Sequence, residues 1–124
     1  MSIRAEKEID YDKGWDNWDA ELLLSSLADD FVFDDPAMPE PVNRANIVVY
    51  MMSWQDRVKS LGGTGEIENR NRVSIDRDGV IFSWYWWSFP GTKYEGAAVQ
   101  KITDEGVHYE RIAYYPETPK FSVE

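Results

Sequence analysis

The chain has 124 residues, of which 43% are hydrophobic and 15% are aromatic. This length predicts one domain over residues 1–124, and the apolar content excludes a disordered segment. The formal net charge of -10 excludes nucleic acid and anionic membrane surfaces as expected partners, because such a charge repels phosphate groups.

An aromatic stripe predicts the first helix. Its members are Tyr11, Trp15 and Trp18, which recur at i, i+4 and i+7. Asp19 can cap a second helix. The apolar stripe of that helix consists of Ala20, Leu23, Leu24 and Leu27. We expect the helix to end at residues 28–30.

A short strand is predicted next, over Phe31–Asp35, and Pro36 ends it. The third helix has the clearest period in the sequence. Its apolar positions are Ile47, Tyr50, Met51, Trp54, Val58 and Leu61. We expect Asn43 to cap this helix and Gly62 to end it.

Alternating runs separated by turn residues predict four strands in the second half of the chain. They cover residues 66–76, 80–89, 94–103 and 107–115, with turns at 78–79, 90–91 and 104–106. Three helices followed by a strand meander predict an α+β fold, in which the helices cover one face of a largely antiparallel sheet.

The strand over residues 80–89 carries aromatic side chains on both faces. Phe82, Trp84 and Trp86 share one face, whereas Tyr85 and Trp87 share the other. We expect the helices to cover the first face. The second face would then be an exposed apolar patch, which predicts a homodimer formed through the outer face of the sheet.

The first half of the chain resembles a known family. The stretches Asp19–Pro36 and Pro41–Ile47 resemble SnoaL-like polyketide cyclases and ketosteroid isomerases, and the similarity in element order extends over nearly the whole chain. The resemblance implies a cone-shaped, nuclear-transport-factor-2-like fold with a strongly curved mixed sheet around a pocket. Members of that family include isomerases, cyclases, dehydratases and proteins that only bind, so the fold alone leaves the function open.

The resemblance also implies catalytic positions. Asp35 matches the general base of the isomerase-like members, and Tyr11 matches the tyrosine that donates a hydrogen bond to the developing oxyanion. A second oxyanion donor of that family falls on either Ala98 or Gln100, and of these two only Gln100 has a side chain that donates. Each of the two catalytic candidates also has a structural interpretation, Asp35 as a turn cap and Tyr11 as a core residue.

The substrate site is expected to contain further residues. Arg111 and Tyr115 lie at positions of one face of the last strand, where Arg111 is either an anion clamp or a surface partner of Glu110. The expected aromatic walls are Trp15, Trp54, Phe82, Trp84 and Trp86. His108, the single histidine, has the opposite parity to Arg111 and is expected at the surface.

No metal site or cofactor is expected. Asp34 and Asp35 are neighbours on a strand and point to opposite faces, and no phosphate loop or zinc spacing occurs. The chain has no Cys, no apolar run of the roughly 18 residues that span a bilayer, and a charged start at Met1–Asp10, which together predict a cytoplasmic protein.

Two functions remain open at this point. The first is a cofactor-free enzyme that moves a proton on a small hydrophobic carbonyl compound, with Asp35 as base and Tyr11 as donor. The second is a non-catalytic module that binds a small hydrophobic molecule or a protein partner.

Overall fold

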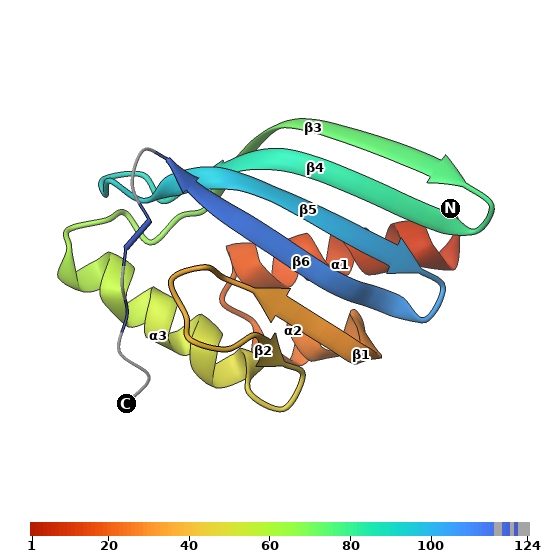
Figure 1. Ribbon diagram of the computed structural model, residues 1–124, viewed down its shortest axis with the longest axis horizontal. Helices are drawn as coiled ribbons and strands as arrows, with labels where there is room; N and C mark the ends of the chain where they lie inside the picture. The colour runs from red at the N-terminus through yellow and green to blue at the C-terminus, as the bar shows by residue number, and fades with distance from the viewer. Residues whose placement is uncertain (116–117, 120, 122–124) are drawn as a thin grey trace.

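The computed structural model describes residues 1–115, 118–119 and 121, and within them three helices pack against one six-stranded sheet (Figure 1). The helices are α1 (Ile3–Asp16), α2 (Ala20–Ser25) and α3 (Ile47–Ser60). The strands are β1 (Leu27–Asp34), β2 (Val42–Asn43), β3 (Glu68–Arg77), β4 (Val80–Ser88), β5 (Glu95–Thr103) and β6 (Gly106–Tyr115). The predicted α+β order of helices followed by a meander is confirmed.

The helix caps agree with the sequence at α2 and differ at α3. Asp19 caps α2, and its Oδ1 accepts a hydrogen bond from the Leu22 N–H at 3.1 Å. The N-cap of α3 is Asn46 rather than Asn43. Asn43 instead ends β2, and its side-chain oxygen accepts from the Asn46 N–H at 3.2 Å, so it orders the turn that leads into the helix.

Gly14 allows α1 and α2 to pack closely. A Cβ atom at this position would lie 2.8 Å from the Cα atom of Leu23, whose side chain is fully buried. The glycine within α1 therefore makes room for α2, although a glycine inside a helix costs about 1 kcal/mol relative to alanine.

The sheet has the strand order β2-β1-β6-β5-β4-β3, and only the β1–β6 pair is parallel among these neighbours. β1 begins at Leu27, so the expectation that this residue belongs to the second helix is wrong. The Val107 N–H donates to the Ser26 carbonyl at 2.8 Å, and Leu27 pairs with Val107. Because of these contacts with β6, the chain leaves the helix at Ser26 and β1 starts at Leu27.

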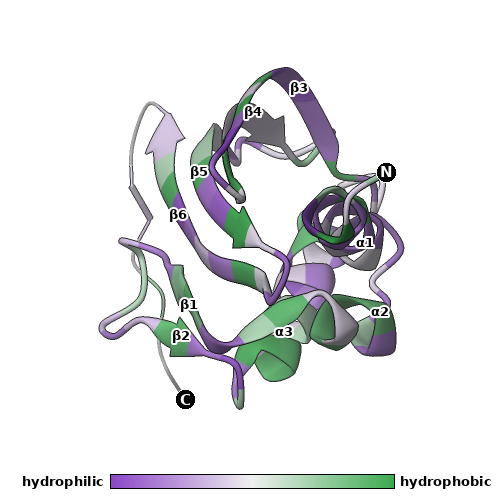
Figure 2. Ribbon diagram, turned by 90° about the vertical axis from the view of Figure 1, so that its right-hand side faces the viewer, coloured by the Kyte–Doolittle hydropathy of each residue, from purple (hydrophilic) through white to green (hydrophobic). Residues whose placement is uncertain are grey.

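The sheet curls around the helices, so that its concave face and the helices enclose the core (Figure 2). This is the curved α+β architecture that the resemblance implies. Among the described residues, no helix is both long and apolar enough to cross a membrane.

β4 faces the opposite way from the prediction. Tyr85 and Trp87 are buried against the helices, whereas Phe82, Trp84 and Trp86 are 44%, 41% and 48% exposed on the outer face. Strand parity separates two sets of side chains but does not tell which set faces the core. The polar atoms of the inward-facing pair are hydrogen-bonded. The Tyr85 hydroxyl donates to Glu110 at 2.7 Å, and the Trp87 indole N–H donates to the Ala97 carbonyl at 3.1 Å.

Candidate active site

An aromatic cavity lies between the helices and the concave face of the sheet. Its walls are aromatic side chains from α1, α3, β1, β4 and the residue after β4, namely Trp15, Tyr50, Trp54, Phe33, Tyr85, Trp87 and Phe89. The cavity has a volume of about 50 Å³, and its mouth opens to solvent. That volume holds a few waters, so a larger ligand would extend into the mouth.

Two carboxyl groups also line this aromatic cavity. Asp12 comes from α1 and Glu110 from β6. They are brought together because α1 packs against the inner faces of β5 and β6. Carboxyl groups in a mainly apolar wall are costly to bury, which marks this part of the cavity as a candidate for chemistry.

Arg72 on β3 holds Asp12 in place. Its Nη2 lies 2.7 Å from Asp12 Oδ2, and its Nη1 lies 3.2 Å from Glu8 Oε2, one helical turn earlier on α1. Nη1 also donates to Gln100 Oε1 at 3.3 Å, while the Ser83 hydroxyl donates to Glu8. One guanidinium therefore serves two carboxylates and an amide.

Glu110 is bound on one of its two oxygens. The Tyr85 hydroxyl donates to Glu110 Oε1 at 2.7 Å, and the Gln100 amide donates to the same atom at 2.8 Å. Burial raises the pKa of Glu110, and these donors oppose that shift. Two donors on Oε1 leave Oε2 as the place for the proton that burial favours.

Asp12 titrates near neutrality. Burial raises its pKa from 3.8 to about 7; the charge of Arg72 opposes this shift, and the charge of Glu110 adds to it. A carboxyl group with such a pKa is present in both protonation states at neutral pH, which suits it to accept and return a proton.

Two buried donors beside this pair are unpartnered. Among the described residues, the Tyr11 hydroxyl and the Trp15 indole N–H are buried and make no hydrogen bond. Trp15 lines the cavity, whereas Tyr11 does not. Burial and the nearby charge of Glu110 raise the pKa of the Tyr11 hydroxyl, and Trp15 opposes this shift. An unsatisfied buried donor costs about 1–3 kcal/mol, so the Trp15 N–H, which belongs to a wall residue, fits a site that is completed by a ligand oxygen.

Asp35 lies elsewhere in the core. It is 2% exposed and is not part of the cavity wall. Tyr50 donates to Oδ2 at 2.6 Å, Tyr114 donates to both oxygens at 2.9 Å, and the Ala37 N–H donates to Oδ1 at 2.8 Å. Tyr50 is the link between the two places, since its ring lines the cavity and its hydroxyl binds Asp35.

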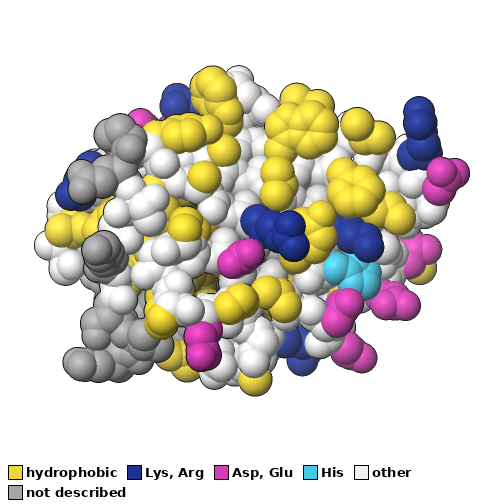
Figure 3. Space-filling model, viewed as in Figure 1, with side chains coloured by type: hydrophobic (Ala, Val, Ile, Leu, Met, Phe, Trp, Pro, Cys, Tyr) yellow, Lys and Arg dark blue, Asp and Glu magenta, His cyan; other side chains and the backbone are white. Residues whose placement is uncertain are grey.

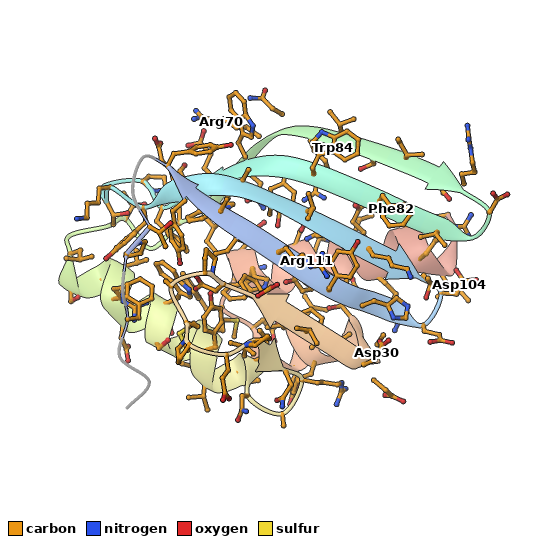
Figure 4. The ribbon with its side chains drawn as sticks, viewed as in Figure 1. Asp30, Arg70, Phe82, Trp84, Asp104 and Arg111 are labelled. Atoms are coloured by element: carbon orange, nitrogen blue, oxygen red, sulfur yellow. The ribbon has the colours of Figure 1, made fainter. Side chains whose placement is uncertain are left out.

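Several predicted wall and clamp residues lie on the wrong face. Phe82, Trp84 and Arg111 stand on the outer face of the sheet (Figure 4), as do Trp86 and Tyr115. The Arg111 side chain is 63% exposed, with its Nε 3.9 Å from Asp34, so it is not an anion clamp inside the cavity. Trp15 and Trp54 do line the cavity, and Gln100 is buried in the polar network behind it.

The sequence interpretation missed Asp12 and Glu110. Asp12 lies three residues before Trp15 and four after Glu8, which is the spacing of one helix side. Glu110 shares its strand parity with Ile112 and Tyr114, which face inward. A carboxylate on the inward-facing, otherwise apolar side of this strand was therefore the feature of the sequence that could have pointed to Glu110.

A second polar cluster lies at the β5–β6 turn, away from the cavity. His108 Nδ1 is 2.7 Å from Asp30 Oδ1, and His108 Nε2 is 2.7 Å from Thr103 Oγ1. These contacts join β1 to the turn. In the part of the chain that the structure describes, no group of three or more His, Asp or Glu side chains is arranged to hold a metal ion.

Solved structures share this fold at low sequence identity. An NTF2-like protein of unknown function from Cytophaga hutchinsonii is 7% identical, with a TM-score of 0.64 over 94% of this chain and 93% of that chain. A protein proposed to be a SnoaL-like polyketide cyclase from Shewanella denitrificans is 13% identical, with a TM-score of 0.63 over 95% and 94%. A protein proposed to be a ketosteroid isomerase from Kribbella flavida is 13% identical, with a TM-score of 0.61 over 98% and 83%.

No family model matches the chain, and no curated protein matches its sequence. The likeness is therefore one of fold. The chain has the nuclear-transport-factor-2-like fold, which is the fold that the sequence resemblance implied and that proteins of the cyclase and isomerase type also use.

Proposed function

We propose that this protein is a cofactor-free enzyme that moves a proton on a small hydrophobic carbonyl compound held in the aromatic cavity. The observation that carries the proposal is the pairing of Asp12 and Glu110 in the wall of that cavity. The proposal keeps the reaction class suggested by the sequence and assigns the base to Asp12 rather than to Asp35.

Asp12 is the proton acceptor. Its raised pKa of about 7 means that the ionised form is available at neutral pH and is basic enough to abstract a proton from the carbon next to a carbonyl group. Arg72, which binds Oδ2 at 2.7 Å, orients the carboxylate. Return of the same proton to a different carbon completes an isomerisation and restores Asp12.

Glu110 is the proton donor to the substrate oxygen, and it takes this proton back when the second carbon is protonated. As the α-proton leaves, negative charge develops on the carbonyl oxygen, and a neutral carboxylic acid stabilises it by donating from Oε2. The Tyr85 and Gln100 donors fix the other oxygen of Glu110 and so orient the acid. The Trp15 N–H is a further donor at the wall, and Tyr11 is a positioning residue next to Glu110.

The fold supports this reaction class at a coarse level. The Shewanella and Kribbella proteins described above are proposed to be a SnoaL-like polyketide cyclase and a ketosteroid isomerase. Fold likeness does not carry residue roles, so the assignment to Asp12 and Glu110 depends on the cavity itself.

Solvent deuterium exchange tests the proposal. A panel of small aliphatic and aromatic ketones is incubated with the protein in D₂O, and exchange next to the carbonyl is followed by NMR. We expect exchange with the unchanged protein and a loss of at least about 10²-fold in Glu110→Gln, because the amide cannot give up a proton to the oxyanion. Glu6→Gln, which changes an exposed acid on the same helix as Asp12, is the matched control.

Binding of ketones without exchange contradicts the enzyme and supports the alternative, a module that only binds a small hydrophobic molecule. The aromatic walls would serve either protein. Loss of exchange in Asp35→Asn with full exchange in Glu110→Gln would return the catalytic role to the position that the resemblance suggested.

We also propose that the protein forms a homodimer through the outer face of the sheet. Side chains there that are 41–49% exposed are Val73, Ile75, Phe82, Trp84, Trp86, Val99 and Tyr115. Apolar side chains gather on this face, with Lys and Arg among them (Figure 3). So many large exposed apolar side chains on one face are uncommon on a monomer, and a stable dimer needs about 800 Å² from each partner.

Trp84→Lys tests the dimer. A charge in an apolar interface should dissociate the pair, so sedimentation should give a particle near 14.4 kDa instead of twice that mass. Leu61→Lys changes a residue that is 51% exposed after α3 and should leave the dimer intact. An unchanged protein that sediments as a monomer at micromolar concentration would refute this interface.

A further inference from the structure

The aromatic cavity combines two features that recognise the same chemical group. Its walls are mainly Trp, Tyr and Phe side chains, and the carboxyl group of Asp12, whose ionised form is present at neutral pH, lies among them. Among the described residues that line it, none is Lys, Arg or His. Aromatic faces attract cations through the ring quadrupole, and carboxylates attract them through charge.

The charge behind the wall is only partly neutralised. Arg72 contacts Glu8 at 3.2 Å and Asp12 at 2.7 Å, and it is the cation that the structure places against these acids in its described part. Its guanidinium also lies 4.2 Å from the centre of the Tyr85 ring. Two carboxylates, Glu8 and Asp12, therefore share one cation inside a chain whose net charge is -10.

The unpartnered donors indicate a second feature of the ligand. The Trp15 N–H belongs to a wall residue and, among the described residues, is buried without an acceptor. A ligand oxygen would satisfy such a donor. Aromatic rings, a carboxylate and an unpartnered donor together fit a small molecule with both a cationic nitrogen and a carbonyl oxygen.

We propose that the ligand of this cavity is a small ammonium ketone, whose alkylammonium group sits among the aromatic rings near Asp12 and whose carbonyl oxygen accepts hydrogen bonds at the Glu110 end. The inference rests on the proposed function and names its substrate class. A positive charge near the reacting carbon stabilises the negative charge that forms when Asp12 removes the α-proton, so the same group that gives affinity also favours the chemistry.

Two probes of nearly equal shape test the charge directly. (2-Oxopropyl)trimethylammonium and 4,4-dimethylpentan-2-one differ in having a quaternary nitrogen or a quaternary carbon, and both carry a ketone. We expect the ammonium ketone to bind at least about 10-fold more tightly in titration calorimetry, because a desolvated cation among aromatic rings is favoured by roughly that factor or more. Asp12→Asn should remove most of this preference, whereas Glu6→Gln, a loss of one exposed charge from the same helix, should keep it.

Proton release gives a second readout that does not depend on catalysis. A cation near Asp12 favours its ionised form, so binding of the ammonium ketone at pH 7 should release protons, seen as a dependence of the binding enthalpy on buffer. The carbon isostere should release fewer. Asp12→Asn should abolish the difference between the two probes.

The outcomes separate this inference from the proposed function. Equal or weaker binding of the ammonium ketone, or a preference that survives Asp12→Asn, overturns the inference, while exchange of the neutral ketone would still support the enzyme. Preferential ammonium binding without deuterium exchange of either probe supports the inference and contradicts catalysis. Absence of binding by both probes at millimolar concentration overturns this ligand class.

Discussion

Two buried carboxyl centres in one core differ in how their hydrogen-bonding capacity is met. Asp35 accepts from two phenols and a backbone N–H, is 2% exposed, and does not itself line the cavity. Asp12 and Glu110 lie in the cavity wall, where Asp12 shares Arg72 with Glu8 and Glu110 is bound through one oxygen.

The difference separates a structural carboxyl group from a reactive one. Burial, and to a lesser extent the charge of Asp35, raises the pKa of Tyr50, so this phenol remains a neutral donor. The hydrogen bonds from Tyr50 and Tyr114 to Asp35 hold α3 and β6 to the end of β1. The Asp12 and Glu110 pKa values are both raised, because burial outweighs their partners. Acid groups that have raised pKa values and line a cavity are available to a substrate.

The largest expected effect is on the rate of Asp12→Asn. The substitution keeps the shape and removes the proton acceptor, so deuterium exchange of a ketone substrate should fall by at least about 10²-fold. In the unchanged protein the rate should rise with pH through about 7, because the base must be ionised. Initial rates between pH 5 and 9 measure both. A full rate in Asp12→Asn would contradict its role as the base.

The next effect is on the stability of Asp35→Asn. The new amide places a donor where an oxygen now accepts from a phenol, so we expect a loss of about 2 kcal/mol in the free energy of unfolding. Urea unfolding measures it, and the exchange rate of the folded variant should stay within a few-fold of the unchanged protein. An unchanged free energy of unfolding would show that the hydrogen bonds of Asp35 do not stabilise the fold.

More of the fold than of the site could be predicted, because alternation along a strand locates the strand but does not tell which of its faces is buried. Turn residues and alternation located β3 to β6 within about two residues, and the period of Ile47–Val58 located α3. Parity also separated Phe82, Trp84 and Trp86 from Tyr85 and Trp87. Which set faces the helices depends on the curl of the whole sheet, and both sets are aromatic.

The site required contacts between distant residues. Asp12, Arg72 and Glu110 come from α1, β3 and β6, and no local pattern joins them. Asp35 was favoured because its local sequence resembles that of a catalytic position. Its isolation from the cavity follows from the positions of Tyr50 and Tyr114, which are 15 and 79 residues away.

A smaller effect is expected for Tyr114→Phe. This change removes one donor from Asp35, which keeps Tyr50 and the Ala37 N–H, so the free energy of unfolding should fall by about 1 kcal/mol. Tyr115→Phe is the matched control, because that side chain is 44% exposed on the outer face and should change little. Equal losses in both variants would mean that the Asp35 bond contributes nothing.

An effect of similar size is expected from Asp12, which makes the stability depend on pH. Its pKa rises from 3.8 to about 7 on folding, so between these values the folded protein keeps a proton that the unfolded chain has released. This contribution to stability is fully present below pH 3.8 and is lost as the pH rises through about 7. The free energy of unfolding of the unchanged protein should therefore fall, relative to that of Asp12→Asn, between pH 4 and pH 8.

We expect this relative fall to be about 1 kcal/mol, well below the ~4 kcal/mol that corresponds to a shift of this size at about 1.4 kcal/mol per pKa unit. Asp12 is 25% exposed, and its bond to Arg72 strengthens as it ionises, so solvent and the guanidinium both reduce the cost of the charge. Urea unfolding of both proteins across that range measures the difference, and the contribution of Glu110 largely cancels because both proteins contain it. Parallel stability curves would mean that Asp12 titrates at its ordinary pKa and is no better suited to accept a proton than any surface acid.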